Sequence, residues 1–361
     1  MTALVAGGGL SGGAVACLLA AEATLVERER GPHDKICGEF ISHEAQGYLA
    51  RLGVDLVALG AAPIGRVRLV HGSRMAEAAL PFQGMGLTRH VLDAALLDRA
   101  AARGATVLRG HAVRSASAAG LEVEGHGLLA APALFLATGK HDLRGVRRDV
   151  QAPEDLVGLK MYFRLSRAQS AELAGHVEVL LFPGGYAGLQ HVEGGVANLC
   201  LLIGRARFAA AGSTWDGVRA YLQQACPYLD RRLAGAAELL ERPVSIFRVP
   251  YGFVHRPGPA DWPGLYRLGD QMGVIPSFCG DGMSIALHTA FAAVKAHRSG
   301  RLGYHARMAR TLSGQIGRAQ WLYNAGRARP ALVLAAARAW PGALRWIARL
   351  TRVSPWALAE T

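Results

Sequence analysis

The sequence predicts an α/β fold in which a parallel sheet is interleaved with a mostly antiparallel sheet and followed by a helical C-terminal region. Residues 3–27 read as a strand, a glycine-rich turn, a helix of small residues and a second strand, the order that builds parallel sheets. HVEVLLF (His176–Phe182) and VANLCLLI (Val196–Ile203) have the apolar, partly alternating pattern of strands in an antiparallel sheet. Residues 301–361 mix Arg, Trp and Leu at helical spacing.

The composition indicates a globular protein with a sizeable core. The 361 residues are 51% hydrophobic, which suits one or two domains. No window approaches the roughly 18 apolar residues that a membrane span needs, and the chain starts with a strand pattern rather than a signal-like segment. The five cysteines are scattered without the spacing of metal ligands, as is typical of reduced thiols. We therefore expect a cytoplasmic protein with no metal site.

The net charge of +13 is concentrated at one end of the chain. Residues 301–361 hold ten Arg and a single acid, Glu360, so the remainder of the chain is only weakly basic. Only four of the 40 basic residues are Lys, which points to a general preference for Arg. A nucleic-acid-binding protein needs a basic surface on its body, so this distribution argues against that class.

The first glycine-rich turn predicts a dinucleotide site. In TALVAGGGLSGGAVACLLAAEATLVERE, Gly7, Gly9 and Gly12 match Gly-x-Gly-x-x-Gly between a strand and a helix. Gly7 permits the tight turn, Gly9 lets a pyrophosphate approach the backbone, and Gly12 allows close packing of helix on strand. Glu27 ends the second strand, where a carboxylate accepts hydrogen bonds from ribose hydroxyls, and the following Arg28 is a further candidate cofactor-binding residue. Because Glu27 would repel a 2′-phosphate, FAD or NAD is expected here rather than NADP.

Three later segments carry a resemblance to a known superfamily. They are LTRHVLDAALLDRAAARGATVLRGHAV (87–113), ALFLATGKHDLRG (133–145) and LGDQMGVIPSFCGDGMSIAL (268–287). Together with the N-terminal motif, and in the same order, they resemble the FAD-dependent superfamily of aromatic hydroxylases (the p-hydroxybenzoate hydroxylase type), flavin halogenases and geranylgeranyl reductases. The resemblance covers roughly residues 1–300. It implies a flavoprotein with a Rossmann-type FAD-binding domain and a cavity beneath an antiparallel sheet.

The resemblance assigns FAD contacts to particular residues. Arg89 of the Arg-x-x-Leu-Asp segment would lie along the flavin side chain, and Val113 would meet the adenine. Asp270 would hydrogen-bond the ribityl chain. The turn that interrupts the last apolar run would place a helix N-terminus against the pyrophosphate and the ring, through Gly280, Gly282 and the N–H of Met283.

The branch closest to this sequence is the geranylgeranyl reductase-like one. DKICGEFIS (34–42) is similar to the Lys-x-Cys-Gly stretch of those reductases, which implies that Cys37 lies near the flavin and the substrate. Gly273 and Met283 also match that pattern. The halogenase motif Trp-x-Trp-x-x-Pro is absent, which argues against halogenation. A small buried filler is the alternative for Cys37, and Glu39 is expected to be a solvated carboxylate.

The predicted substrate wall is more polar than in isoprenoid reductases. In FPGGYAGLQHVEGGVANLCLL, the strand pair gives Tyr186, Gln190 and His191 at the corresponding positions. Such a wall favours a polar or aromatic head group over a long isoprenoid chain, because apolar burial contributes about 25 cal/mol per Å². His191 titrates in a range suited to proton transfer. A structural or exposed histidine is the alternative.

Two reactions and one other class of function stay open from the sequence. The leading hypothesis is an FAD-dependent oxidoreductase that transfers hydride to an alkene of a hydrophobic isoprenoid, polyketide or aromatic molecule, with His191 as the acid. The alternative is a monooxygenase that hydroxylates an aromatic or polyketide substrate. NAD(P)H is the expected external reductant, although Thr138-Gly139 replaces the Asp-Gly of the hydroxylases. The other class is a membrane-surface electron carrier.

The order of the motifs predicts interleaved domains. An FAD-binding domain is expected from 1–60, 86–145 and 255–300, and a substrate domain from 61–85 and 146–254. Residues 301–361 are expected to form a helical region that Pro330 and Pro341 divide into short helices. This region is either a cap on a membrane surface or lipid substrate, or a helical subdomain packed on the substrate domain with a solvated Arg face.

Overall fold

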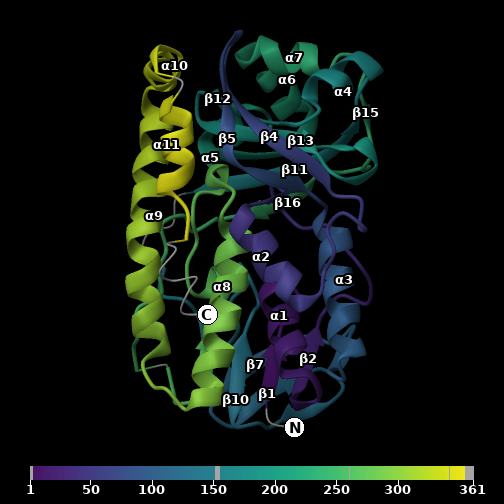
Figure 1. Cartoon of the computed structure of the whole chain (residues 1–361), viewed down its shortest axis with the longest axis vertical. Coiled ribbons are helices and arrows are strands. Elements are labelled where there is room, and N and C mark those ends of the chain that lie inside the picture. Colours follow the sequence, from purple (N-terminus) through teal and green to yellow (C-terminus); the bar gives the residue numbers. More distant parts are fainter. Residues whose placement is uncertain (1–2, 151–154, 260, 341, 354–361) are drawn as a thin grey trace.

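The computed structural model describes residues 3–150, 155–259, 261–340 and 342–353, and it contains two main sheets (Figure 1). The first sheet has five strands, all paired in parallel. Its central strands are buried along their whole length, as parallel strands covered on both faces must be. The strand order is β17 (Leu265–Arg267), β10 (Ala133–Leu136), β1 (Ala3–Ala6), β2 (Ala23–Glu27) and β6 (Thr106–Arg109).

Both faces of the parallel sheet are covered. On one face, α1 (Leu10–Leu19), α3 (Arg89–Ala102) and α8 (Gly282–Ser299) pack with the sheet into the largest apolar cluster. On the other face lies a three-stranded antiparallel sheet whose Ala116, Leu121 and Val123 pack against alternate residues of β1 and β10. Its strands are β7 (Val113–Ser117), β8 (Gly120–Val123) and β9 (Gly127–Leu129). This is the Rossmann-type layering that the N-terminal motif predicts.

The second sheet has nine strands and is mostly antiparallel, with one parallel pair between β12 and β4. It lies above the parallel sheet in the view of Figure 1. The two segments predicted as antiparallel strands are confirmed, since they form β12 and β14. In order, the strands are β15 (Ala237–Glu238), β11 (Leu156–Arg164), β14 (Ala197–Gly204), β13 (Gly185–His191), β12 (His176–Phe182), β4 (Ala62–His71), β5 (Arg74–Gly86) and β3 (Phe40–Ile41), and β16 (Val244–Phe247) pairs with β11.

The two faces of this second sheet carry different cores. Side chains alternate along a strand, so Ala187 and Leu189 of β13 join one apolar cluster whereas Tyr186 joins another. The cluster of Ala187 is closed by the short helices α4 (Arg167–Leu173), α6 (Trp215–Ala225) and α7 (Pro227–Arg232). Two further short helices are α2 (His43–Leu52), which packs against α8 and α1, and α5 (Arg205–Ala210), which packs against β14 and β11.

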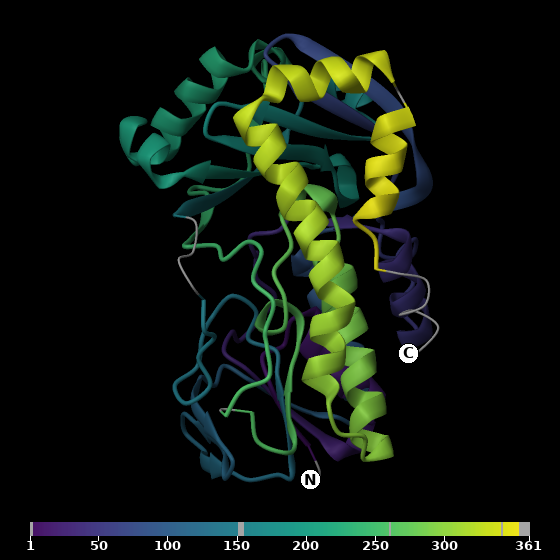
Figure 2. The same cartoon turned by 90° about the vertical axis from the view of Figure 1, so that its left-hand side faces the viewer.

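In the described part of the C-terminal region, three helices lie along one side of the molecule (Figure 2). They are α9 (Tyr304–Ala328), α10 (Pro330–Ala339) and α11 (Gly342–Leu350). The expectation of short helices needs a correction, because the residues before Pro330 form one helix of 25 residues. Arg329 then leaves the helical conformation, as a residue before proline tends to do, and Pro330 opens α10 at a position where no N–H is needed. Pro341 lies outside the described residues.

These helices are packed against the protein rather than extended from it. Tyr323, Leu334 and Leu344, one from each helix, join the cluster that contains Tyr186 on the second sheet. Among the described residues, no helix combines the length and apolar character that crossing a bilayer would require.

Candidate functional site

A cavity of about 420 Å³ lies at the carboxyl ends of the parallel strands. The residues that follow β1, β10 and β17 line it, and so does the last residue of β2. Residues of the segment 33–40, of β16 and of the first turn of α8 complete the wall. The carboxyl edge of a parallel sheet is where ligands bind in open α/β folds.

The first turn has the geometry for which its glycines were predicted. Gly7 has φ of +102°, and its N–H donates to Val26 O at 2.9 Å. A Cβ on Gly12 would collide with the carbonyl oxygen of Gly7. Gly9 caps α1 without any side-chain hydrogen bond, so the first N–H groups of that helix face the cavity that Gly9 lines.

Glu27 and Val113 line one part of this cavity, together with Arg28. The Glu27 carboxylate accepts hydrogen bonds from Gly8 N at 2.6 Å and from Glu29 N at 2.9 Å. Each oxygen therefore keeps a lone pair for a ligand hydroxyl. Arg28 pairs with Glu29 at 3.0 Å and is exposed.

Two cations converge on the first turn of α1. Arg89 and Lys35 both bind Asp93, each through contacts of 2.8 Å, and Arg89 does so with two nitrogens. A Cβ placed on Gly9 would lie 3.3 Å from Arg89 Nη2 and 3.6 Å from Lys35 Nζ. Burial opposes ionisation of Asp93, but the two cations hold the pKa of its carboxyl below its usual range. The cavity thus has two fixed positive groups beside a helix N-terminus.

Asp270 lies at the cavity in an ion pair with Lys140, whose Nζ is 2.8 Å from Asp270 Oδ2. Lys140 belongs to the loop after β10, and Asp270 to the loop after β17. Gln271 joins the same two loops by donating to Gly139 O at 2.8 Å. Lys140 is thus a loop residue that serves as the ion-pair partner of Asp270.

The second glycine-rich turn opens α8 at the cavity. Gly280 has φ of +72°, and a Cβ there would lie 2.6 Å from Phe40 Cδ1. At Gly282, by contrast, a Cβ would meet nothing within 4 Å, which leaves the helix N-terminus accessible. Gly280, Gly282 and Met283 all line the cavity. The structure therefore brings both glycine turns, Arg89, Val113 and Asp270 to one cavity.

A buried ion pair closes the cavity on the side of the second sheet. Glu39 and Lys160 are fully buried, with Lys160 Nζ 2.6 Å from Glu39 Oε1. Tyr162 donates to Glu39 at 2.9 Å, and its oxygen also lies 3.1 Å from Asp34 Oδ1. Glu39 and Asp34 line the cavity. The expectation of a solvated Glu39 is corrected, because this carboxylate has Lys160 as its partner.

Sequence reasoning missed Lys160 and Tyr162, although the strand LVGLKMYFR held a signal. The two polar residues are spaced by two in an otherwise apolar, buried strand, so they share one face. Cys37 also lines the cavity, and its Sγ accepts a hydrogen bond from Glu39 N at 3.3 Å. Cys37 is therefore within reach of a ligand in the cavity.

The predicted substrate wall is not among the residues that line the cavity. His191 lies on the β13 face that bears Ala187 and Leu189, and its Nε2 is 3.2 Å from Ser170 Oγ of α4. Burial and the charge of Arg232 lower the pKa of His191, which favours the neutral ring. The structure thus places His191 away from the cavity, because a single step along a strand changes the face.

Tyr186 and Gln190 lie on the opposite face of β13 from His191. Tyr186 reaches the cavity only indirectly, since its hydroxyl is 2.9 Å from Tyr251 Oη, which donates to the cavity residue Ser277 at 2.6 Å. Gln190 is 2% exposed and pairs across the sheet with Asn198.

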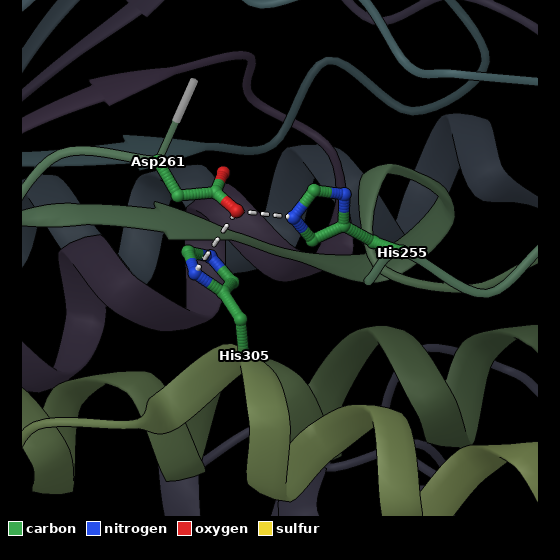
Figure 3. A group of neighbouring side chains, drawn as sticks. All are labelled: His255, Asp261 and His305. Atoms are coloured by element: carbon green, nitrogen blue, oxygen red, sulfur yellow. Dashed lines mark hydrogen bonds and ion pairs between the residues drawn. The ribbon is translucent and has the colours of Figure 1, made fainter. Parts of the chain in front are cut away.

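A second group with ligand-like geometry lies outside the cavity (Figure 3). Asp261 Oδ2 is 2.7 Å from His255 Nε2 and 3.9 Å from His305 Nδ1. Two histidines and a carboxylate form a set that suits Zn²⁺.

The hydrogen bonds of this group argue against a metal. The backbone N–H of Arg267 donates to His305 Nε2 at 3.1 Å, so Nε2 carries the lone pair and Nδ1 carries the proton. A metal on Nδ1 would require the opposite tautomer. The Arg267 guanidinium also lies 3.0 Å from Asp261 Oδ1 and compensates its charge. Burial lowers the pKa of His305 to about 4. The group is a buried network of hydrogen bonds and an ion pair that connects β17 with α9.

No family model matches this sequence, and no curated protein sequence matches it. Solved structures share its fold. A flavoprotein/dehydrogenase from Cytophaga hutchinsonii superimposes with a TM-score of 0.79 at 16% identity, over 97% of this chain and 92% of that one. The flavin-dependent brominase Bmp2 gives 0.77 at 16% identity, over 97% and 92%. PqsL, a probable FAD-dependent monooxygenase from Pseudomonas aeruginosa, gives 0.72 at 16% identity, over 91% and 97%.

The fold is that of flavin-dependent halogenases and FAD-dependent monooxygenases. The predicted fold class is confirmed by these structures, which match the parallel sheet, the antiparallel sheet and the helical region together. The geranylgeranyl reductase-like branch stays a prediction.

Proposed function

We propose that this chain is an FAD-dependent oxidoreductase that acts on a hydrophobic small molecule. The observation that carries the proposal is the single cavity shared by both glycine turns, Glu27, Arg89 and Asp270. These groups come from segments far apart in the sequence, and each offers what one part of FAD requires. Likeness of fold to flavoenzymes supports the same conclusion.

The residues of the cavity fit an extended dinucleotide. Glu27 has acceptor capacity for ribose hydroxyls, and the bare N-terminus of α1 would receive the pyrophosphate with Arg89 and Lys35 beside it. Asp270 would accept from the ribityl chain. The open position above Gly282 leaves room for the ring against the start of α8. When bound, FAD would supply the redox chemistry, passing two electrons from an external reductant such as NAD(P)H to O₂ or to a substrate.

We favour monooxygenation over hydride transfer to an alkene. Reduction of an alkene needs an acid beside the substrate, and His191, the candidate from the sequence, lies on the far face of β13. Oxygenation instead needs a closed, orienting site, which Glu39, Lys160 and Tyr162 provide by holding the second sheet over the cavity. The fold is shared with a probable monooxygenase. Halogenation is not proposed, because the Trp-x-Trp-x-x-Pro motif is absent from the sequence.

Hydride transfer stays the second candidate because of Cys37. Its Sγ is at the cavity beside Glu39, and a thiol can donate the proton that completes a reduction. The sequence around Cys37 is also the part that resembles the geranylgeranyl reductases. In that case Cys37→Ser should reduce turnover without affecting FAD affinity.

The test begins with FAD and ends with the product. Titration of the purified chain with FAD, followed by absorbance and fluorescence, should show saturable binding. The holoenzyme is then supplied with NAD(P)H, isotopically labelled O₂ and candidate aromatic, polyketide and isoprenoid substrates. Label in the product supports oxygenation, and a saturated product without label supports reduction. Transfer of electrons to an external acceptor with no altered substrate would support an electron carrier. Absence of FAD binding would overturn the central proposal.

A further inference from the structure

In the part of the chain that the structure describes, the exposed tryptophans lie on or directly after the C-terminal helices. Trp321, Trp340 and Trp346 are exposed by 69%, 60% and 54%. Trp321 lies in α9, Trp340 directly follows α10, and Trp346 lies within α11. Of the other tryptophans in the described residues, Trp215 and Trp262 are half-buried. Several large exposed aromatic side chains on neighbouring helices are typical of a surface that binds a partner or a membrane.

We call the exposed residues between 321 and 350 the C-terminal face. Apart from the three tryptophans and Leu332, they are arginines, alanines and one asparagine, and none is acidic. The helices that carry this face lie along one side of the molecule (Figure 2). Their other sides are used in packing, through Leu334, Ala337 and Leu344. The exposure of the tryptophans and Leu332 is therefore not caused by a lack of packing of these helices against the apolar core.

The segment that carries the C-terminal face has no acidic residue to offset the positive charge of its arginines. Between Asp281 and Glu360 the chain contains no Asp or Glu. Arg338, Arg345 and Arg349 are all exposed, and they belong to α10 and α11. Beside the end of α9, Arg207 and Arg327 line a hollow of about 550 Å³. A surface of guanidinium and indole groups is complementary to phosphate and to the boundary between water and hydrocarbon.

We propose that the C-terminal face binds the surface of a bilayer containing anionic lipids. Arginines gain from the negative surface potential, and indoles gain from insertion at the depth of the head groups. A second copy of this chain is a poor occupant, because a symmetric interface would set like charges against each other. A nucleic-acid duplex would pair with the arginines but leave three indoles and Leu332 in water. This proposal is independent of the reaction that the cavity performs.

The test is vesicle flotation with the full chain. Binding should be strong to vesicles of phosphatidylcholine with 30% phosphatidylglycerol, weak to phosphatidylcholine alone, and reduced by salt, because surface charges are screened. A variant with Arg338, Arg345 and Arg349 changed to Gln should bind about 100-fold more weakly, since each basic residue near the surface contributes roughly fivefold. A variant with Trp321, Trp340 and Trp346 changed to Ser should lose about tenfold or more and lose the blue shift of indole fluorescence.

The matched control changes Arg30, Arg114 and Arg147 to Gln. These three are exposed on the body of the protein, and their loss lowers the net charge by the same amount. Unchanged vesicle binding by this control supports the proposal, and equal weakening would overturn it in favour of net charge alone. The proposal also fails if the tryptophan variant floats like the wild type. If duplex DNA retains the protein, the tryptophan variant loses this retention, and vesicles do not bind the protein, then the partner of this face is nucleic acid and not a membrane. Concentration-dependent dimerisation that the tryptophan variant abolishes would replace it by a second copy.

Discussion

Arg352 donates to Asp281, with Nη1 2.8 Å from Asp281 Oδ1, and its Nη2 lies 3.0 Å from the carbonyl oxygen of Cys279. Asp281 sits between the two glycines of the turn that opens α8, and it is fully buried. The residues after α11 therefore hold the turn that lines the cavity. Burial raises the pKa of Asp281 to about 7, with Arg352 opposing the shift and Glu44 adding to it.

Replacing Arg352 by Gln should loosen this turn. Without the guanidinium, the pKa of Asp281 rises further and the carboxyl is neutral at pH 7. The free energy of unfolding should fall by about 1–3 kcal/mol, and FAD should bind about tenfold more weakly, because the N-terminus of α8 is no longer fixed. Thermal denaturation and FAD titration measure the two effects. Arg310→Gln, at an exposed position of α9, is the control. Equal FAD affinity in both variants would contradict the prediction.

Replacing Glu27 by Gln should weaken FAD binding more than it weakens the fold. The carboxylate accepts from two backbone N–H groups, and an amide would set its own NH₂ against one of them. We expect a dissociation constant for FAD about 10- to 100-fold higher, measured by fluorescence titration. Glu29→Gln is the neighbouring control, since the Glu29 side chain is 39% exposed and pairs with Arg28. A similar loss in both variants would indicate a general charge effect instead of a contact to the ribose.

Replacing Lys160 by Met should strongly destabilise the protein. Glu39 would remain as a buried carboxylate that has lost its cation, and breaking a buried pair in this way costs about 3–5 kcal/mol. Chemical denaturation of the two single variants and of the Glu39→Gln, Lys160→Met double variant measures the coupling. The double variant should be more stable than Lys160→Met alone. If its loss is instead the sum of the two single losses, the pair contributes nothing as a pair.

The glycine turns and Glu27 could be predicted because their roles are set locally. Gly7 needs a positive φ and Gly12 needs the absence of a side chain, and both requirements follow from the β-α-β order within 25 residues. Asp93 belongs to the Arg-x-x-Leu-Asp segment, but its pairing with Lys35 joins elements 58 residues apart. The pair of Glu39 with Lys160 spans 121 residues. Such contacts depend on how the two sheets meet, which periodicity does not encode.

His191 shows why the predicted wall failed to assemble. The strand GYAGLQH has buried residues on both faces, so polarity does not fix which face each residue takes. The period of two puts His191 on the same face as Ala187 and Leu189, and the packing of the sheet turns this face toward the short helices α4, α6 and α7. The helices of the C-terminal region could be predicted from the helical spacing of their Arg, Trp and Leu residues. The contact of Arg352 with the turn at the cavity could not be predicted, because one Arg in a basic segment does not indicate which residue it pairs with.

Stability should decline as the pH falls from about 6.5 to 4, and His288 should account for one proton of this dependence. Burial lowers the pKa of His288 to about 4, and its Nδ1 is 2.8 Å from Tyr48 Oη. Below the unfolded pKa of about 6.5, the unfolded chain binds a proton that the folded state binds only near pH 4, so the free energy of unfolding decreases by up to about 3 kcal/mol across this window. Asp281, whose pKa is raised, contributes with the opposite sign, and the difference between variants is therefore the informative quantity.

His288→Asn removes the titrating ring and keeps a polar group beside Tyr48. The variant should lose about one proton from the slope of unfolding free energy against pH between 6.5 and 4, as measured by chemical denaturation at several pH values. The exposed His90 on α3 provides the control, and His90→Asn should leave the slope as in the wild type. His305, also neutral by burial, continues to titrate in both variants, so a residual slope is expected. An identical slope in His288→Asn and wild type would mean that this ring has the same pKa in the folded and the unfolded protein, and would contradict the prediction.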